Sequence, residues 1–368
     1  MSEDYRALYL HIPFCASRCG YCDFVTEALE ADDERISSYT EELIRVLRRS
    51  SRSGELGSVK TVYVGGGTPT HIGSRRLISL VYTVGLSLNL HTDSEFTVEA
   101  NPESLTAPLA RDLFSLGVNR FSLGVQSLND DDLLVLGRGH NSDAARRAIA
   151  TAGERCNNVS VDLICGIPKQ TLSGWQATLR EVVASGVKHI SVYPLTLEAT
   201  TPLARDIAAG RLVLPDDDSQ AELLLATADL LAAEGFERYE VASWARPGYA
   251  CAHNIAYWTG QSYLGLGRGA AGMRNTASGR QRYQDGELVE SLSLRQRLAE
   301  DLMLAMRLAR GIAVSEVQAA EESLAGIAAV FSTLLADGLV ELCEGRYCPT
   351  QRGWLLGNQI FGRIWALA

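Results

Sequence analysis

The sequence of 368 residues lacks features that define whole classes of protein. It has no run of about 20 apolar residues, which a membrane-spanning helix requires. Its N-terminus, MSEDYRALYLHIPF, lacks the basic start and the small-residue cleavage site of a signal peptide. It also has no internal repeats and no low-complexity tracts. We therefore expect a cytoplasmic protein with no membrane anchor of its own.

Positive charge is scarce, because 34 Lys and Arg are set against 44 Asp and Glu, which gives a formal net charge of -10. A general nucleic-acid binder needs a cationic face to displace counterions from phosphates, so we expect no nucleic-acid partner. Eight cysteines without a secretory signal indicate reduced thiols and not a disulfide framework. The 46% of hydrophobic residues and 21% of charged residues are typical of a folded globular chain.

Short β-rich apolar runs recur through the first part of the chain, and a helical pattern follows each of them. We expect strands at 7–12, 61–66, 95–100, 120–125, 159–164 and 189–195. These runs read as apolar on both faces, and such strands, when separated by helices, form parallel sheets with right-handed crossovers. The sequence therefore predicts an α/β fold whose first domain, residues 1–235, is a partial (β/α)6 TIM-like barrel.

The pattern changes after about residue 235. Residues 236–290 form a glycine- and aromatic-rich segment without clear helices, and this segment contains the hexapeptide HNIAYW at 253–258. Residues 291–368 predict helices and a hairpin, which together resemble a small winged-helix domain. Because the helices of this α+β unit carry few Lys or Arg, we favour a structural or partner-docking role for it over DNA binding.

Polar residues gather where the predicted strands end, and the chemistry of such barrels lies at the carboxyl ends of their strands. Cys15, Cys19 and Cys22 form a CxxxCxxC motif after the first strand. Three protein ligands leave one coordination position open, whereas structural sites are closed. A [4Fe-4S] cluster held at three irons leaves its fourth iron to chelate S-adenosylmethionine (SAM). The alternative is a structural Cys3His zinc site that His11 completes.

The CxxxCxxC motif resembles that of the radical SAM superfamily. The ordered stretches YLHIPFCASRCGYCDF, GGGTPT, EANPE, RFSLGVQS, LGRGH, DLICGIPKQT, YPLTLEATTP and YEVASWARPGYACAHNIAYW resemble the oxygen-independent coproporphyrinogen III oxidase family over roughly residues 7–275. The resemblance implies that Cys15, Cys19 and Cys22 hold the cluster. It further implies SAM contacts from Tyr9, Tyr21, Gly66, Gly67, Thr68, Glu99, Gln126, Arg138 and Asp162, with Thr196 as an additional candidate.

Two branches of this family compete. The oxidases convert two propionates of coproporphyrinogen III to vinyl groups, carry an extension before the cluster motif, and have a further cysteine two residues after the third. Here Cys15 lies near the first residue and Phe24 stands at that further position. Both departures favour the haem chaperone branch, and coproporphyrinogen III dehydrogenase is the alternative. A third interpretation is a haem- or zinc-binding module that has lost SAM chemistry, so enzyme activity stays open.

The chaperone branch carries an HNxxYW motif, which residues 253–258 match. Neutral imidazole is a common axial ligand of haem iron, so His253 is the candidate ligand, and a buried structural histidine is the alternative. Cys251 is a competing candidate, and Tyr257 and Trp258 are candidates for an apolar wall. Ala271 stands where relatives often have histidine. The resemblance also implies respiratory haem proteins as haem acceptors, a low-potential electron donor such as flavodoxin, and a homodimer as a candidate assembly.

Overall fold

A computed structural model of the chain describes residues 4–57 and 59–368. The centre of the fold consists of six strands, β1 (Ala7–Ile12), β4 (Thr61–Gly66), β5 (Glu95–Ala100), β6 (Arg120–Gln126), β7 (Val159–Cys165) and β8 (His189–Pro194). They pair in that order, and every pair is parallel. The predicted strand ranges agree with these bounds to within one residue. The expected α/β architecture is therefore confirmed.

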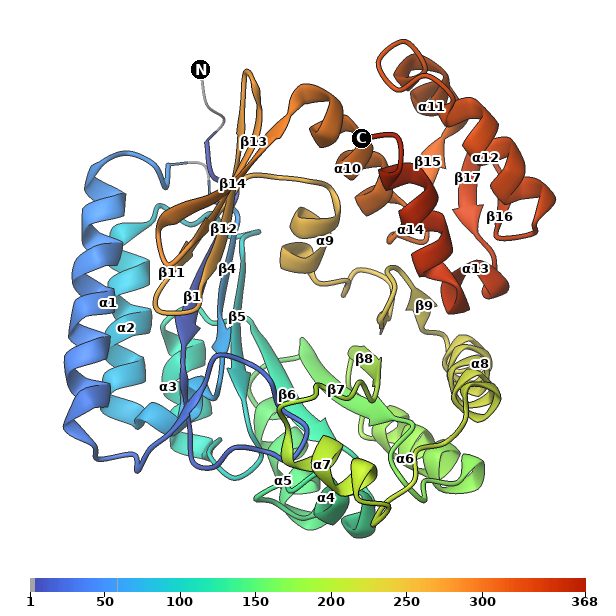
Figure 1. The fold of residues 1–368 in the computed structure, drawn as a ribbon. Helices are drawn as coiled ribbons and strands as arrows, with labels where there is room; N and C mark the ends of the chain where they lie inside the picture. The colour runs from blue at the N-terminus through green and yellow to red at the C-terminus, as the bar shows by residue number, and fades with distance from the viewer. Residues whose placement is uncertain (1–3, 58) are drawn as a thin grey trace.

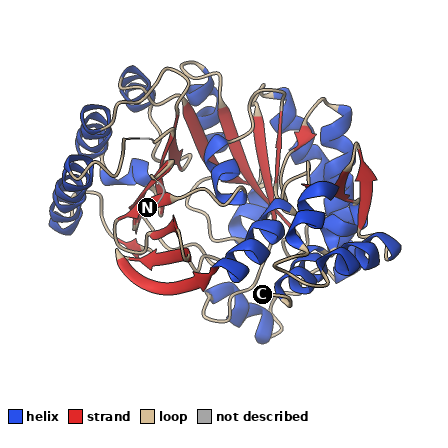
Figure 2. Ribbon diagram, turned by 90° about the horizontal axis from the view of Figure 1, so that it is seen from above, coloured by secondary structure: helices blue, strands red, loops and turns tan. Residues whose placement is uncertain are grey.

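The helices that follow these strands in the chain cover the convex face of the sheet (Figures 1 and 2). They are α1 (Glu34–Arg52), α2 (Ser74–Ser87), α3 (Ala107–Ser115), α5 (Ser142–Gly153), α6 (Leu172–Ala184) and α8 (Asp217–Ala233). Shorter elements in the connections are β2 (Phe14–Cys15), β3 (Glu27–Ala28), η1 (Pro69–Ile72), α4 (Asp130–Val135) and α7 (Pro202–Ala208). Side chains such as those of Asp33, Thr106 and Asn141 accept hydrogen bonds from the first helical N–H groups, which fixes where the helices begin.

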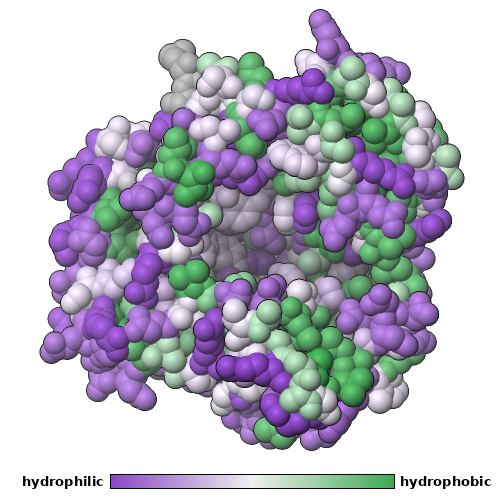
Figure 3. Space-filling model, in the orientation of Figure 1, coloured by the Kyte–Doolittle hydropathy of each residue, from purple (hydrophilic) through white to green (hydrophobic). Residues whose placement is uncertain are grey.

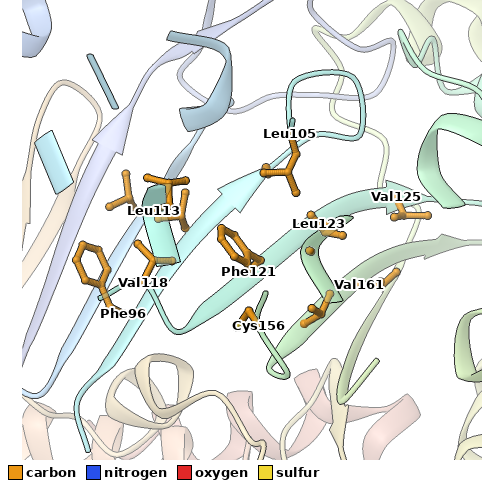
Figure 4. Close-up of a cluster of buried hydrophobic side chains, with 14 of the residues drawn as sticks. Phe96, Leu105, Leu113, Val118, Phe121, Leu123, Val125, Cys156 and Val161 are labelled. Atoms are coloured by element: carbon orange, nitrogen blue, oxygen red, sulfur yellow. The ribbon is translucent and has the colours of Figure 1, made fainter. Parts of the chain in front are cut away.

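The two faces of the central strands differ in polarity. Side chains such as Phe96, Phe121 and Leu123 point outward into the main core, where they meet α3 (Figure 4). The alternate side chains point to the concave side and are polar, as in the hydrogen bond from Ser122 Oγ to Asp162 Oδ2 at 3.1 Å. The expectation that the strands are apolar on both faces is therefore wrong, because the concave side is a polar interior and not a second apolar layer.

Residues 237–293 extend the sheet at both of its edges. The added strands are β9 (Glu237–Arg238), β10 (Ser243–Ala245), β11 (Tyr263–Leu266), β12 (Ala271–Thr276), β13 (Gly279–Gln284) and β14 (Glu287–Ser293). The resulting twelve-stranded sheet has the order β14-β13-β12-β11-β1-β4-β5-β6-β7-β8-β10-β9. Strand β11 pairs in parallel with β1, next to the cysteine loop.

The expectation that residues 236–290 contain no clear helix is wrong. Helix α9 (Ala252–Trp258) contacts β4 and lies on the concave side of the sheet (Figure 1). Its first N–H groups are capped from a distance in sequence, because the Glu95 carboxylate accepts hydrogen bonds from the backbone of Ala252 at 2.9 Å and His253 at 3.0 Å. Because the capping residue lies on β5 and not next to the helix in the chain, the local sequence does not predict where α9 begins.

The C-terminal part has its own apolar core and matches the winged-helix-like expectation. Its elements are α10 (Leu294–Ala305), β15 (Ile312–Ala313), α11 (Val314–Ala320), α12 (Ile327–Ala336), β16 (Val340–Cys343), β17 (Arg346–Pro349), α13 (Gln351–Leu355) and α14 (Gly357–Trp365). Buried Arg280 on β13 pairs with Glu300 on α10 at 2.5 Å, which ties this part to the sheet. Within the described residues, no helix is both long and apolar enough to span a membrane.

Candidate functional site

The loop after β1 carries the three motif cysteines at the carboxyl end of the parallel strands. Its backbone is anchored on both sides, because the Gly20 N–H donates to the Leu136 carbonyl and the Gly20 carbonyl accepts from the Leu203 N–H. All three thiols are partly exposed, and they lie close enough to influence one another electrostatically. Burial raises the pKa of Cys15 to about 11 and also raises the pKa of Cys22. In the metal-free protein these two side chains are therefore neutral thiols.

A continuous set of hydrogen bonds connects two of the cysteines. The Thr68 hydroxyl donates to Cys15 Sγ at 3.4 Å and accepts from Asn101 Nδ2 at 2.9 Å. Asn101 Oδ1 in turn accepts from Arg138 Nη2 at 2.8 Å, and Arg138 Nη1 donates to Cys19 Sγ at 3.3 Å. We call these five residues the thiol network. Donors aimed at both sulfurs stabilise thiolates, which are the form that ligates iron.

The glycine turn after β4 lies directly against the cysteine loop. A Cβ atom at Gly67 would lie 2.7 Å from the Phe14 carbonyl oxygen and 2.9 Å from Cys15 Sγ. Gly66 has a φ of 115° and a Cβ there would lie 2.7 Å from the ring of His11. Side chains are excluded at both positions, so only glycine lets this turn pack directly against His11 and the cysteine loop.

Glu99 projects from the end of β5 toward this turn. Its carboxylate accepts hydrogen bonds from the Tyr63 hydroxyl at 2.7 Å and from the Gly66 N–H at 3.0 Å. Desolvation raises the pKa of Glu99 to about 7, and the nearby carboxylate of Asp162 adds to the rise. A cation bound here would favour the ionised carboxylate, so the position suits an ammonium group.

The remaining predicted SAM residues surround the same concave end of the strands. Asp162 accepts a hydrogen bond from the Ser122 hydroxyl, and burial raises its pKa. Gln126 ends β6 with a φ of 67°, a backbone conformation that is uncommon for non-glycine residues. Tyr21 packs against the apolar cluster around Leu136, and desolvation raises the pKa of its hydroxyl. Thr196 is exposed, and its hydroxyl donates to the Pro194 carbonyl at 3.4 Å.

A pocket of about 470 Å³ opens between β1, the end of the cysteine loop and α9. Gly66 and Glu99 form part of its wall, together with Tyr9 and His11 from β1. The space-filling view is hollowed near its middle, over the concave side of the sheet (Figure 3). Volumes of this size are typical of small-molecule and cofactor sites. The fold thus places a ligand-sized space next to the cysteine loop.

Comparisons with known proteins agree with this geometry. Residues 9–182 match the family model described as the radical SAM superfamily, and residues 292–356 match the HemN C-terminal domain. The chain is 31% identical to the heme chaperone HemW of Bacillus subtilis, over 97% of this chain and 98% of that protein. It is 36% identical to the heme chaperone HemW of Escherichia coli, over 74% and 71% respectively. The chain belongs to the HemW family of radical SAM proteins.

A solved structure shows the same fold as this HemW-family chain. The structure titled coproporphyrinogen III oxidase (HemN) from Escherichia coli, a radical SAM enzyme, aligns with a TM-score of 0.81 at 21% identity. The alignment covers 98% of this chain and 90% of the solved one. The agreement extends over the sheet and the C-terminal part, and it confirms the radical SAM barrel with a C-terminal domain.

The zinc alternative finds no support in this HemW-family structure. Both ring nitrogens of His11 hydrogen-bond away from the cysteines, Nδ1 with the Tyr9 hydroxyl at 2.9 Å and Nε2 with the Val25 carbonyl at 3.2 Å. Across residues 4–57 and 59–368, no three His, Cys, Asp or Glu side chains, the three motif cysteines included, are grouped tightly enough to hold a single metal ion. His11 instead lines the pocket.

The histidine of the HNxxYW motif is buried, with 1% of its surface exposed. His253 Nδ1 hydrogen-bonds the Thr61 hydroxyl at 2.9 Å and Nε2 hydrogen-bonds the Tyr257 hydroxyl at 2.8 Å. Burial lowers the pKa of His253 to about 3, so the imidazole is neutral. Cys251 is fully buried and donates to Glu95, and burial raises its pKa to about 12. As placed here, neither side chain is open to a haem iron.

The sequence places Asn101 and His11 at the carboxyl ends of predicted strands, but it assigns neither of them a role beside the cofactor. Asn101 is the centre of the thiol network, yet its only sequence signal is a position just past the end of a strand. The sequence suggests His11 only as a zinc ligand. However, His11 lies two residues after Tyr9 on the same strand, so both side chains point to the same face and line the same pocket. That period of two is the signal that would have found it.

Proposed function

We propose that this HemW-family chain is a haem chaperone that holds a [4Fe-4S] cluster on Cys15, Cys19 and Cys22 and binds SAM next to it. The thiol network is the observation that carries the proposal. It aims donors at two of the three sulfurs and contains no fourth thiolate and no imidazole, so one iron is left to an outside ligand. The soft thiolate donor set suits an iron–sulfur cluster.

The chain's own residues then bind and orient SAM. The cluster, when bound, supplies the electron that splits the sulfonium, and a low-potential donor such as flavodoxin would reduce it. Gly66 lines the pocket, and its lack of a side chain lets the amino-acid end of SAM lie against the turn. Glu99 loses its proton and pairs with the ammonium group of SAM. The attraction of the bound cation lowers the pKa of Glu99, which desolvation raises in the absence of a ligand. Arg138 holds Cys19 in place during this binding.

Two observations support the chaperone over coproporphyrinogen III dehydrogenase. Relatives named heme chaperone HemW match almost the whole chain. Phe24 occupies the position where the resemblance places a further cysteine in the oxidases, and its side chain is 69% exposed. Under this proposal the chain acts in the cytoplasm and hands haem to respiratory haem proteins, alone or as a homodimer.

The test is anaerobic reconstitution of the full chain with iron and sulfide, followed by three assays on the same sample. We expect about four irons per chain by the cluster stoichiometry, stoichiometric haem binding, and no vinyl product from coproporphyrinogen III. The variant Cys22→Ser should lose the cluster. The matched control Cys156→Ser should keep it, because Cys156 is a buried thiol bonded to the Asn119 carbonyl away from the site.

Each failure of this test has a separate meaning. Vinyl product under reducing conditions would establish the dehydrogenase instead. Zinc in place of iron, with no colour, would overturn the cluster. A cluster-loaded chain that binds no haem would overturn the chaperone function but keep the radical SAM assignment. Release of 5'-deoxyadenosine shows whether the electron reaches SAM.

A further inference from the structure

The pocket beside the cysteine loop has a wall suited to a flat, largely apolar ring. Tyr9, Phe24, Tyr257 and Tyr263 are among its lining residues, and His11 carries the only imidazole among those described. Aromatic side chains combine apolar area with restricted geometry, so they favour stacking ligands. Under the proposed function, on which this inference rests, the ring to be bound is haem.

His253, the candidate from the sequence motif, has its contacts inside the protein. Thr61 on β4 and Tyr257 on α9 occupy its two ring nitrogens, and its backbone N–H donates to Glu95 on β5. Coordination of iron needs a nitrogen lone pair and an open approach, and His253 is 1% exposed. These contacts tie α9 to two strands of the sheet. His253 therefore acts as a positioning residue for α9 and for Tyr257.

His11 has one firm partner and one replaceable partner. The Tyr9 hydroxyl holds Nδ1 at 2.9 Å from inside the sheet. His11 Nε2 hydrogen-bonds the Val25 carbonyl at 3.2 Å. Val25 and the residue before it, Phe24, lie in a loop and are 54% and 69% exposed, so this part of the loop has few contacts that hold it in place. A small movement of residues 24–25 frees Nε2 toward the pocket. Iron-ligating histidines commonly have the other ring nitrogen held by a second residue, the role that Tyr9 would take.

The proton balance of such ligation is simple. A carbonyl oxygen only accepts hydrogen bonds, so Nε2 of His11 carries the ring proton here and Nδ1 accepts from the Tyr9 hydroxyl. For Nε2 to bind iron, that proton leaves Nε2 and another binds Nδ1, which then donates to the Tyr9 oxygen. The ring stays neutral throughout, and the Tyr9 hydroxyl changes from donor to acceptor.

We infer that the pocket beside the cysteine loop is the haem site and that His11 Nε2 is the axial ligand of its iron. Phe24 and Val25, which are exposed at the mouth of the pocket, then cover an apolar edge of the ring. Gly66 and Glu99, which the proposed function assigns to SAM, line the same pocket, so the haem site adjoins the SAM site. The HNxxYW motif supports the pocket wall through Tyr257 and does not supply the ligand.

The test is a ferric haem titration of the full chain, followed by the Soret band and by resonance Raman spectra. In His11→Ala we expect haem affinity to fall by more than the roughly 10–100-fold that loss of a supporting hydrogen bond costs. The spectrum of an imidazole-ligated iron should also disappear, and free imidazole added to His11→Gly should restore it. The matched control His91→Ala should behave as wild type, because the His91 side chain is 79% exposed on the surface.

His253→Ala is the decisive comparison. We expect it to lower the melting temperature by circular dichroism, yet the protein that remains folded should show the imidazole-ligated spectrum. If His253→Ala loses that spectrum with a native melting curve while His11→Ala keeps it, the inference is wrong. If wild type binds haem and His11→Ala binds it equally well, the inference also fails but the chaperone function stands. If wild type binds no haem, the proposed function itself fails.

Discussion

The ionisation of Glu99 is the most direct test of the site's electrostatics. In the folded protein its pKa is raised from 4.5 to about 7, mainly by desolvation. The unfolded chain therefore releases this proton at a lower pH than the folded chain does. Stability is unaffected below pH 4.5, falls as the pH rises from 4.5 to about 7, and is constant above that.

The magnitude follows from the size of the pKa change. A pKa that moves from 4.5 to about 7 corresponds to about 3 kcal/mol at about 1.4 kcal/mol for each pH unit. Glu99 is half-buried and opens on the pocket, so solvent screening reduces this value, and we expect about 1–3 kcal/mol. Glu99→Gln removes the pH-dependent cost. It adds a pH-independent loss of about 1 kcal/mol, since one amide oxygen replaces two acceptors for Tyr63 and Gly66.

The assay is urea unfolding of the cluster-free chain between about pH 5 and pH 8, read from tryptophan fluorescence, since Trp175 and Trp244 are buried in the main core. The stability of Glu99→Gln relative to wild type should rise across this range and then level off. Glu103→Gln is the control of opposite sign. Desolvation acts to raise the pKa of Glu103, but its contact with His140, a backbone hydrogen bond and the charge of Arg138 together lower it. A difference between Glu99→Gln and wild type that does not vary with pH would refute the reasoning.

Three further predictions concern the cysteine loop. Arg138→Gln removes the donor to Cys19 Sγ, so cluster affinity should fall by roughly 10-fold or more, and an unchanged iron content after gel filtration would count against the thiol network. Burial raises the pKa of Cys15 to about 11, so cluster assembly should release protons and should become faster between about pH 7 and pH 9. The rate of assembly is measured from the visible absorbance of the cluster, and a rate that does not depend on pH would contradict this prediction. Gly67→Ala places a Cβ 2.7 Å from a carbonyl oxygen and should cost about 1–3 kcal/mol together with much of the iron. Gly85→Ala on α2, with no atom within 4 Å of the added Cβ, should stabilise the chain by up to about 1 kcal/mol in the same thermal melts, and equal effects of the two changes would disprove the steric argument.

The buried ion pair between the sheet and the C-terminal part could not be predicted from the sequence. Arg280 and Glu300 are both almost fully buried and lie 2.5 Å apart, although nothing in their local sequence distinguishes them from surface residues. A charge is tolerated inside a protein when its partner is also there, and the partner is chosen by the fold.

The local sequence determined much of this protein. Each of the six central strands was placed to within one residue, because short apolar runs bounded by helix signals depend only on neighbouring residues. The motif spacing likewise brought Cys15, Cys19 and Cys22 onto one loop, since residues so close in the chain cannot separate far.

Only the tertiary structure decided the rest. It made one face of the strands polar, formed α9 by a cap from Glu95, and joined Cys15 to Cys19 through Asn101. It also buried His253 between Thr61 and Tyr257 while leaving His11 in the pocket wall. All of these outcomes depend on contacts between residues that are far apart in the chain. Such contacts form only when particular strands become neighbours in the sheet, and no local sequence pattern specifies which strands will do so.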